Sequence, residues 1–337
     1  MSQRVTQSDI ARHLAIGQKT VSRALGAPGY IAPDTRERVL AAAGELGYRR
    51  HSSAAAMRTG CFRNVILLQG KNTAASTLPQ GVLHGICDRL AEDDIALTVA
   101  RYDDEALATD GFLPRALREV SADGLLIKYD INVPAALSEH LERHHLPAVW
   151  INSKHESNAV YPDDFGAGQA ATQWLLAQGH RHIAYLDAGY AHNPVFHYSR
   201  DDRLAGYRAA MHTAGLATRE HLTISRSDAS EVAEHVARAI EHDRPTALLT
   251  YGGGEAAMAV RACALRNWVV GQDVAILSVG SERVFAGLSV TSMVCSDELL
   301  GHRSADLLIR RLHSEGASQP SEALPFQLVP GRSASVR

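Results

Sequence analysis

The chain has 337 residues, 45% of them hydrophobic, and a formal net charge of −3 at pH 7. These values are ordinary for a globular protein and predict two or three domains. No segment approaches the ~18 apolar residues of a membrane span, and the first residues lack a signal peptide's apolar core, so we expect a cytoplasmic protein that binds no membrane. The cysteines have no paired spacing and the histidines lack a matched acidic cluster, so we expect no metal, no cofactor and no disulfide framework; the cysteines are Cys61, Cys87, Cys263 and Cys295.

The chain begins with two short predicted helices joined by a tight turn. In the first helix Ile10, Ala11 and Leu14 share one face, and Thr6 before them is a good N-cap residue. The second helix turns its apolar residues inward and shows a polar face made of Gln18, Lys19, Thr20, Ser22 and Arg23. Such side chains reach phosphates and base edges, which is typical of the second helix of a helix-turn-helix. The alternative is a plain helical hairpin on an enzyme.

A third predicted helix begins at Pro33 and ends before Gly47, and its inward stripe is Val39, Leu40, Ala43 and Leu46. Residues 1–60 hold nine Lys and Arg against four acidic residues, whereas the rest of the chain holds 25 against 33. A basic head therefore precedes an acidic body. Because phosphate contacts supply most non-specific DNA affinity, this asymmetry favours a nucleic-acid-binding headpiece.

Four segments of this region resemble the headpiece of the LacI/GalR family of bacterial repressors, namely residues 6–11, 20–25, 35–39 and 45–48. The resemblance implies that residues 1–47 form a DNA-binding headpiece whose second helix reads bases in the major groove. By this resemblance the DNA-contacting residues are Thr6, Gln18, Lys19, Thr20, Ser22 and Arg23. Ala15, Gly17 and Ala32 depart from the family's usual turn and capping residues, and each lost cap costs ~1 kcal/mol without removing the fold.

Residues 48–61 connect the headpiece to the body. In the resembling family this segment is a hinge helix that enters the minor groove, which implies DNA contacts for Ala54 and Met57. Met57 stands where the family has a Leu that wedges between bases, and Met can also serve as such a wedge. Arg50 and His51 replace the family's usual Pro-Asn. The alternative is a flexible linker.

From Val65 onward, short apolar runs alternate with amphipathic segments. Strands are predicted over 65–69, 95–100, 124–129, 148–152, 183–187, 222–225, 247–251, 274–279 and 290–293, and helices over 80–92, 134–144, 167–178, 203–213, 231–242, 255–267 and 298–312. This alternation predicts parallel sheets covered on both faces. More than eight units are too many for one compact sheet, so we expect two similar lobes with a ligand in the cleft between them.

The body also resembles the LacI/GalR family, in residues 146–152, 163–168, 179–184, 203–207 and 245–247. The resemblance implies a small all-α helix-turn-helix headpiece plus an α/β, two-lobed periplasmic-binding-protein-like body with two doubly wound parallel sheets. The effector-binding and dimerisation domain would span residues 62–337. Its first lobe would take residues 62–160 and 291–320 and its second residues 161–290 and 321–337, with crossings near Tyr161, Thr291 and Ser321.

The resemblance places a set of candidate effector-binding residues in the cleft: Lys128, Asn152, Tyr198, Ser199, Arg203, Tyr251, Gly280 and Asp297. Arg203 matches the family's effector-binding Arg, and a planar guanidinium suits a carboxylate, a phosphate or vicinal hydroxyls. Asn152 stands where the family often has Asp. Two other acidic or amide groups are replaced by Gly252–Gly254 and by Ser278–Ser281, so aromatic residues (His197, Tyr198, Tyr251 and Trp150) are expected to stack on the ligand instead. A sugar, a sugar acid and a base-like ring all remain open as the effector.

We therefore predict a transcription regulator, most simply a repressor, that is not an enzyme. Its partners would be a double-stranded, inverted-repeat operator, a small-molecule effector such as a sugar derivative, and a second copy of the chain; a tetramer is the larger alternative. It would work at the bacterial nucleoid. The rival hypothesis is an α/β enzyme or a simple ligand-binding protein whose Gly252–Gly254 turn cradles a phosphate. The chain lacks the Gly-Lys-Ser/Thr of a P-loop and any Gly-x-Gly-x-x-Gly after the first strand.

Overall fold

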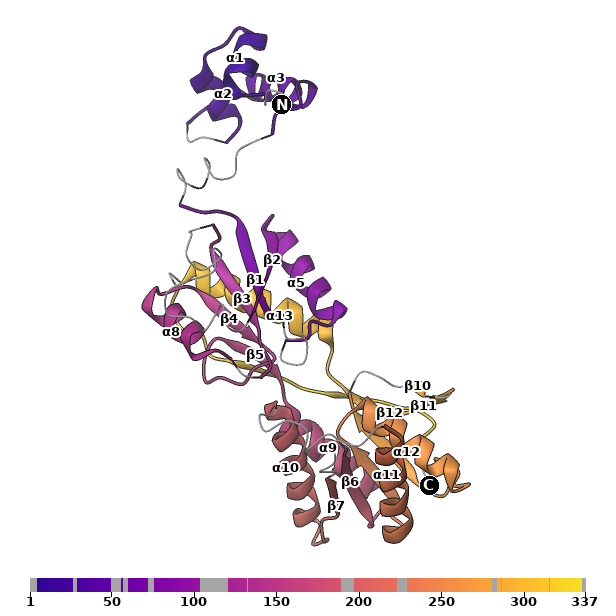
Figure 1. The fold of residues 1–337 in the computed structure, drawn as a ribbon. Helices are drawn as coiled ribbons and strands as arrows, with labels where there is room; N and C mark the ends of the chain where they lie inside the picture. The colour runs from indigo at the N-terminus through magenta and orange to yellow at the C-terminus, as the bar shows by residue number, and fades with distance from the viewer. Residues whose placement is uncertain are drawn as a thin grey trace. The chain divides into compact units, whose positions relative to one another are not determined.

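The computed structural model describes residues 5–26, 29–49, 56, 60–71, 76–103, 121–131, 133–188, 197–222, 229–280, 284–285, 287–314 and 316–334. The chain divides into two compact units, Met1–Phe62 and Arg63–Arg337 (Figure 1). We call them the headpiece and the body.

The headpiece consists of α1 (Gln7–Leu14), α2 (Gln18–Ala24) and α3 (Pro33–Glu45) around one small core. Thr6 caps α1 as predicted, because its hydroxyl accepts from the Asp9 amide at 3.3 Å while the Asp9 carboxylate accepts from the Thr6 amide at 2.9 Å. Ile10, Val21 and Val39, one from each helix, are fully buried in the core. The prediction that Leu40 faces inward is wrong.

Leu40 is 53% exposed, and Ala42 and Ala43 fill its expected place in the core. The reason is the helical period: three and four residues beyond the buried Val39 lie Ala42 and Ala43, whereas Leu40 is turned about 100° away. A small residue at these positions lets α3 approach α1 and α2 closely.

The first lobe of the body is built on a six-stranded sheet with the order β13-β5-β4-β3-β1-β2, in which every pair is parallel. The strands are β1 (Asn64–Gly70), β2 (Ala96–Tyr102), β3 (Gly124–Lys128), β4 (Ala148–Ile151), β5 (Ala159–Pro162) and β13 (Glu322–Leu324). Helices α5 (Gln80–Glu92) and α13 (Asp297–His313) cover one face and α8 (Ala135–Arg143) the other. Accordingly, Val65 and Leu67 of β1 enter one core while Ile66 and Leu68 enter the other.

The second lobe repeats this plan with the order β14-β12-β9-β8-β6-β7. The strands are β6 (Ile183–Asp187), β7 (Glu220–Leu222), β8 (Ala247–Thr250), β9 (Ala275–Val279), β12 (Thr291–Val294) and β14 (Gln327–Val329). Helices α9 (Asp164–Ala177) and α10 (Tyr198–Thr213) cover one face, and α11 (Ala229–Asp243) and α12 (Gly253–Leu265) the other. A short hairpin joins β10 (Val284–Phe285) to β11 (Leu288–Ser289). The predicted pair of doubly wound parallel sheets is confirmed, except that the edge strand β14 is antiparallel to β12.

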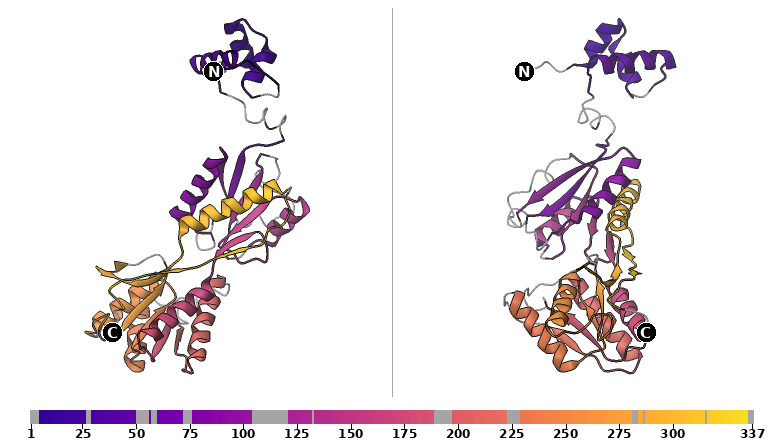
Figure 2. Two further views of the ribbon diagram at one scale, coloured as in Figure 1. Left: turned by 180° about the vertical axis from the view of Figure 1, so that it is seen from behind. Right: turned by 90° about the vertical axis from the view of Figure 1, so that its right-hand side faces the viewer.

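The chain passes between the lobes three times, and the last passage follows α13, the yellow helix that lies along α5 in both views of Figure 2. Strand pairing decides where each passage falls. Because β12 pairs with β9, residues 291–294 belong to the second lobe, and because β13 pairs with β5, residues 322–324 belong to the first. The passages therefore lie near Asp163, Ser296 and Pro325, a few residues after the expected positions.

Helices α9 and α10 touch backbone to backbone, which makes Gly206 a sensitive position. A Cβ on Gly206 would lie 2.2 Å from the Phe165 carbonyl oxygen, whereas a Cβ on Gly254 would meet nothing within 4 Å. We expect Gly206→Ala to lower the free energy of unfolding by ~1–3 kcal/mol or more, because backbone atoms cannot move aside as a side chain can. Gly254→Ala is the matched control and should be neutral or slightly stabilising. Urea denaturation followed by the fluorescence of Trp174, which packs in the same core, measures both; equal midpoints would contradict this account of the packing.

Candidate functional site

The polar face of α2 forms the candidate DNA-binding surface of the headpiece. Val21 and Ala24 are buried against α1 and α3, and this fixes which side of the helix faces outward. Gln18, Lys19 and Arg23 are exposed and Thr20 and Ser22 are half-buried on the outer side. Exposed amide, ammonium and guanidinium groups on one short helix can reach base edges and phosphates.

The other predicted DNA-contacting residues lie as follows. Thr6 is exposed at the start of α1, where its hydroxyl already takes part in the N-terminal cap of that helix. The Arg23 side chain lies along the turn after α2, because a Cβ on Gly29 would lie only 2.9 Å from Arg23 Nε. The predicted hinge contacts Ala54 and Met57 lie outside the described residues.

A polar cavity of about 220 Å³ opens where the strands of the two sheets end. Five of the eight predicted effector residues line it: Lys128, Asn152, Arg203, Gly280 and Asp297. Three of them come from the first lobe and two from the second, so a ligand here would contact both lobes. Further lining residues are Thr77, Pro79, Val82, Asp130, Pro162, Cys295, Leu300 and Phe326.

The first-lobe side of the cavity carries a charged cluster around Asp130, a residue that the sequence analysis did not select. Lys128 is only 2% exposed, and its ammonium forms an ion pair with Asp130 Oδ1. Asn152 Nδ2 donates to the same oxygen at 3.0 Å. Burial lowers the pKa of Lys128, against the opposing effect of Asp130 and Asp297, and burial also raises the pKa of Asp297. The cluster offers both donors and acceptors to a polar ligand.

The second-lobe side is dominated by Arg203, which is held in a fixed orientation. Its Nε donates to Asp164 Oδ1 at 2.7 Å, and its Nη1 donates to the carbonyl oxygens of Tyr251 and Val279 at 2.6 and 3.1 Å. Asp164 is itself 1% exposed. The close approach of α9 and α10 makes this pair possible, because Gly168 lies directly against the Arg203 backbone. No partner for Nη2 exists among the described residues, so this end of the guanidinium is available to a ligand.

Tyr198, Ser199 and Tyr251 do not line the cavity, and they form a hydrogen-bonded layer beside it instead. Ser199 Oγ lies 2.9 Å from Tyr251 OH and 2.8 Å from His197 Nδ1, while His197 Nε2 lies 2.8 Å from the Asn152 carbonyl oxygen. The Tyr251 ring packs against the guanidinium groups of Arg200 and Arg203, whose central carbons lie 4.8 and 4.7 Å from the ring centroid. These residues therefore position Arg203 and Asn152.

Helix α10 begins five residues before its predicted start at Arg203. The His197 side chain accepts from the Ser199 amide and acts as the N-cap, a role for which His is an uncommon choice. As a result Ser199 and Arg203 lie within the first two turns of one helix. Tyr198 OH donates to the carbonyl oxygen of Pro162 at 3.3 Å.

The strand predicted over residues 222–225 also differs from the structure, because β7 spans Glu220–Leu222 and so ends at the residue where that strand was expected to begin.

The expectation that Trp150 stacks on the ligand in the cleft is wrong. Trp150 lies in the core beneath α8 and stacks on His155, with ring centroids 4.6 Å apart. The cleft lies beyond the end of β4, where Asn152 adopts a left-handed conformation with φ of 58°. Trp150 therefore belongs to the face of the sheet and Asn152 to its carboxyl edge.

The Gly252–Gly254 turn begins α12, with Gly252 as its N-cap. A Cβ on Gly252 would lie 3.3 Å from Glu255 Oε2, so a carboxylate already stands at this helix start. Burial raises the pKa of Glu255. A carboxylate beside the turn repels a phosphate, which argues against the phosphate-cradling alternative. Among the residues that the structure describes, no group of three His, Cys, Asp or Glu side chains is arranged to hold a metal ion.

A basic helix-turn-helix unit joined to a two-lobed α/β unit with a polar cleft defines a class of protein, the ligand-responsive DNA-binding regulators. Residues 6–51 match the family model of the bacterial regulatory proteins of the lacI family, and residues 172–334 match the periplasmic binding protein-like domain. The chain therefore carries a LacI-family helix-turn-helix domain followed by a periplasmic-binding-protein-like domain, the arrangement of a DNA-binding transcription regulator with an effector-binding domain.

Full-length relatives and solved structures agree with this assignment. The chain is 28% identical to the transcriptional regulator CelR of Thermobifida fusca over 93% of each chain, and 24% identical to the repressor PurR of Klebsiella pneumoniae over 97% of this chain and 96% of the relative. The Lac repressor bound to ONPG superposes with a TM-score of 0.77 at 20% identity, covering 98% of this chain and 100% of the other. A CelR–cellobiose complex has a TM-score of 0.64 at 24% identity, with the same coverage. None of the helices in the described part of the chain has the length and apolarity needed to span a bilayer.

Proposed function

We propose that the protein is a homodimeric repressor whose affinity for an inverted-repeat operator is controlled by a small polar effector bound between its lobes. The observation that carries the proposal is the cavity itself, since Lys128 and Asp297 on one side meet Arg203 on the other. The relatives CelR and PurR are transcription regulators rather than enzymes. Operator binding implies a place at the bacterial nucleoid in the cytoplasm.

The headpiece would insert α2 into the major groove, with Gln18, Lys19 and Arg23 toward base edges and phosphates. Thr6, Thr20 and Ser22 would add polar contacts around them. Ala54 and Met57 would enter the minor groove, where an apolar side chain can open a base step and bend the duplex. The two-fold symmetry of a dimer would then be mirrored in its operator.

The cavity favours a sugar or a sugar derivative as the effector. It offers carboxylate acceptors from Asp130 and Asp297 and donors from Lys128, Asn152 and Arg203 Nη2, a mixture that suits several hydroxyl groups on one small molecule. A volume of about 220 Å³ is below the ~300–1,000 Å³ typical of drug-sized ligands and suits a compact one. Solved structures with the same fold hold ribose or cellobiose.

Such a ligand would act by stabilising one arrangement of the lobes. It can shift operator binding only to the extent that it binds the two arrangements with different affinity, and contacts from both lobes supply that difference. A thermal-shift screen of ribose, cellobiose, glucose, gluconate and adenine tests the assignment. A stabilising compound should also change operator affinity; a compound that stabilises the protein without changing DNA binding would contradict effector control.

We expect strongly salt-dependent binding to an inverted repeat, because two basic headpieces neutralise phosphates on both half-sites. Footprinting on the protein's own promoter region should show two protected half-sites related by two-fold symmetry. The control is a DNA of the same composition with one half-site scrambled, which should bind far more weakly. Protection of one asymmetric half-site by a monomer would overturn the dimer proposal.

A further inference from the structure

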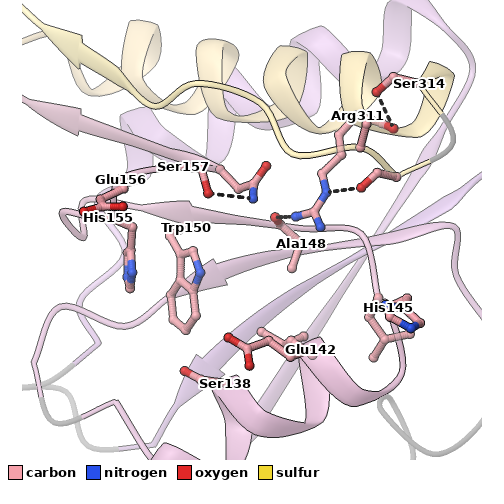
Figure 3. A pocket seen from close by; sticks show the side chains of 15 residues that line it. Ser138, Glu142, His145, Ala148, Trp150, His155, Glu156, Ser157, Arg311 and Ser314 are labelled. Carbon is pink, nitrogen blue, oxygen red and sulfur yellow. Dashed lines mark hydrogen bonds between the residues drawn. The ribbon is translucent and has the colours of Figure 1, made fainter.

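The first lobe contains another cavity, larger than the cleft and sharing none of the described residues with it. Its volume is about 910 Å³, within the ~300–1,000 Å³ typical of small-molecule sites. It lies between α8, β4, the segment joining β4 to β5 and the turn after α13 (Figure 3).

The cavity exists because one crossover lacks a helix. Parallel neighbours are usually joined through a helix that covers the sheet, as α5 joins β1 to β2 and α8 joins β3 to β4. Strands β4 and β5 are parallel neighbours too, but residues 152–158 between them form no helix. The face of the sheet beside α8 is therefore covered there by an extended segment only.

One wall of this cavity is aromatic. Trp150 and His155 stack with their ring planes 25° apart, and Ser153 Oγ lies 3.1 Å from His155 Nε2 and fixes that ring. Burial lowers the pKa of His155, so the ring is neutral near pH 7. A flat, uncharged wall suits the face of a ring-shaped ligand.

The opposite ends of the cavity carry opposite charges. Arg311 donates through Nη1 to the Ala148 carbonyl oxygen at 2.5 Å and through Nε to the Gly316 carbonyl oxygen at 3.1 Å. It is half-buried, yet no carboxylate pairs with it in the described part of the chain. In Figure 3 Glu142 and Ser138, on α8, face Arg311 from across the cavity, with Trp150 beside the gap.

We propose that this cavity is a second ligand site, distinct from the effector cleft, for a small aromatic ring with an oxyanion at one end and a hydrogen-bond donor at the other. The Arg311 guanidinium, which pairs with no carboxylate among the residues that the structure describes, takes the oxyanion in a charge-assisted contact. The ring packs on the Trp150–His155 wall. The donor, a hydroxyl or an amine, reaches the Glu142 carboxylate. Such a ligand gives this regulator an input that does not depend on the cleft.

The test uses the full chain with Trp174→Phe and Trp268→Phe, which leaves Trp150 as the sole indole. The probe is 4-hydroxybenzoate, followed through the indole N–H resonance of Trp150 and by calorimetry. We expect a saturable shift of that resonance. The uncharged isostere 4-hydroxybenzamide should bind about tenfold more weakly or worse, because it lacks the oxyanion. No shift with up to about 10 mM 4-hydroxybenzoate, or equal binding of the two compounds, would overturn the proposal.

Variants locate the site. Arg311→Gln should weaken binding of 4-hydroxybenzoate about tenfold or more, whereas Arg310→Gln, its exposed neighbour on α13, should not. Arg203→Ala in the cleft should also leave this binding unchanged, so failure here is distinct from failure of the effector assignment. Should Arg311→Gln fail to fold, Ser138→Phe fills part of the cavity from α8, leaves Arg311 in place and adds no indole. Full affinity in that variant would disprove the site.

Discussion

Arg203→Ala is expected to weaken the response to effector strongly while leaving operator binding without effector near the parental level. Arg203 lines the cleft and is held there by Asp164 and two carbonyl oxygens. Loss of a charge-assisted, geometrically fixed contact removes ~1.5–3 kcal/mol, roughly a tenfold to hundredfold loss of effector affinity. The measurement is a titration of operator binding with the strongest compound from the thermal-shift screen.

Two further variants sharpen this experiment. Arg208→Ala removes an exposed guanidinium from the same helix, where it pairs with Glu220, and should respond as the parent does. Arg203→Lys keeps a positive charge next to Asp164 but loses the planar guanidinium, so it should also bind the effector weakly. It replaces Arg203→Ala in the experiment if that variant is unstable. Parental effector affinity and response in Arg203→Ala would show that the cleft is not the effector site.

Lys19→Ala and Arg23→Ala are expected to weaken operator binding by about tenfold to a hundredfold each, since one good base contact contributes ~1–3 kcal/mol of discrimination. Both residues are exposed on α2, whose opposite side is locked into the headpiece core by Val21 and Ala24. The variants should therefore fold normally. Gel shifts with the operator and with a scrambled duplex distinguish a base-reading role from a phosphate-contacting role.

A base-reading residue loses affinity for the operator only, whereas a phosphate-contacting residue loses affinity for all sequences and lowers the salt dependence. Arg36→Ala removes a charge of the same sign from α3 and serves as the matched control, with a smaller and sequence-independent loss expected. Unchanged operator affinity in both α2 variants would mean that another element reads the DNA.

Much of the fold could be predicted because its signals are local. The Thr6 cap, the Pro33 helix start and the apolar runs of β1, β6 and β9 each lie within a few consecutive residues. Strands β5, β13 and β14 were not predicted. They are three or four residues long, and two are held by pairing with a strand remote in sequence, which no short window can reveal.

The residues of the candidate effector site could also be predicted from the sequence only in part. Asn152 and Arg203 were selected by position in a family motif and Lys128 by its place at the end of a strand, and all three line the cavity. Asp130 was missed, although it lies two residues beyond Lys128, because only the tertiary structure brings Asn152 to the same carboxylate. Tyr251 was placed in the cleft on the strength of its aromatic ring, but that ring packs against the guanidinium groups of Arg200 and Arg203 and does not line the cavity.

The sequence by itself determined the order of most helices and strands, the basic headpiece and the presence of two lobes, since these follow from periodicity, capping and charge along the chain. Only the tertiary structure decided on which side of a lobe each aromatic residue lies. Trp150 and Asn152 are two residues apart and would share a face in a continuous strand, but the left-handed backbone at Asn152 ends that alternation. Asn152 turns into the cleft, while Trp150 stays on the sheet and forms the wall of the larger cavity.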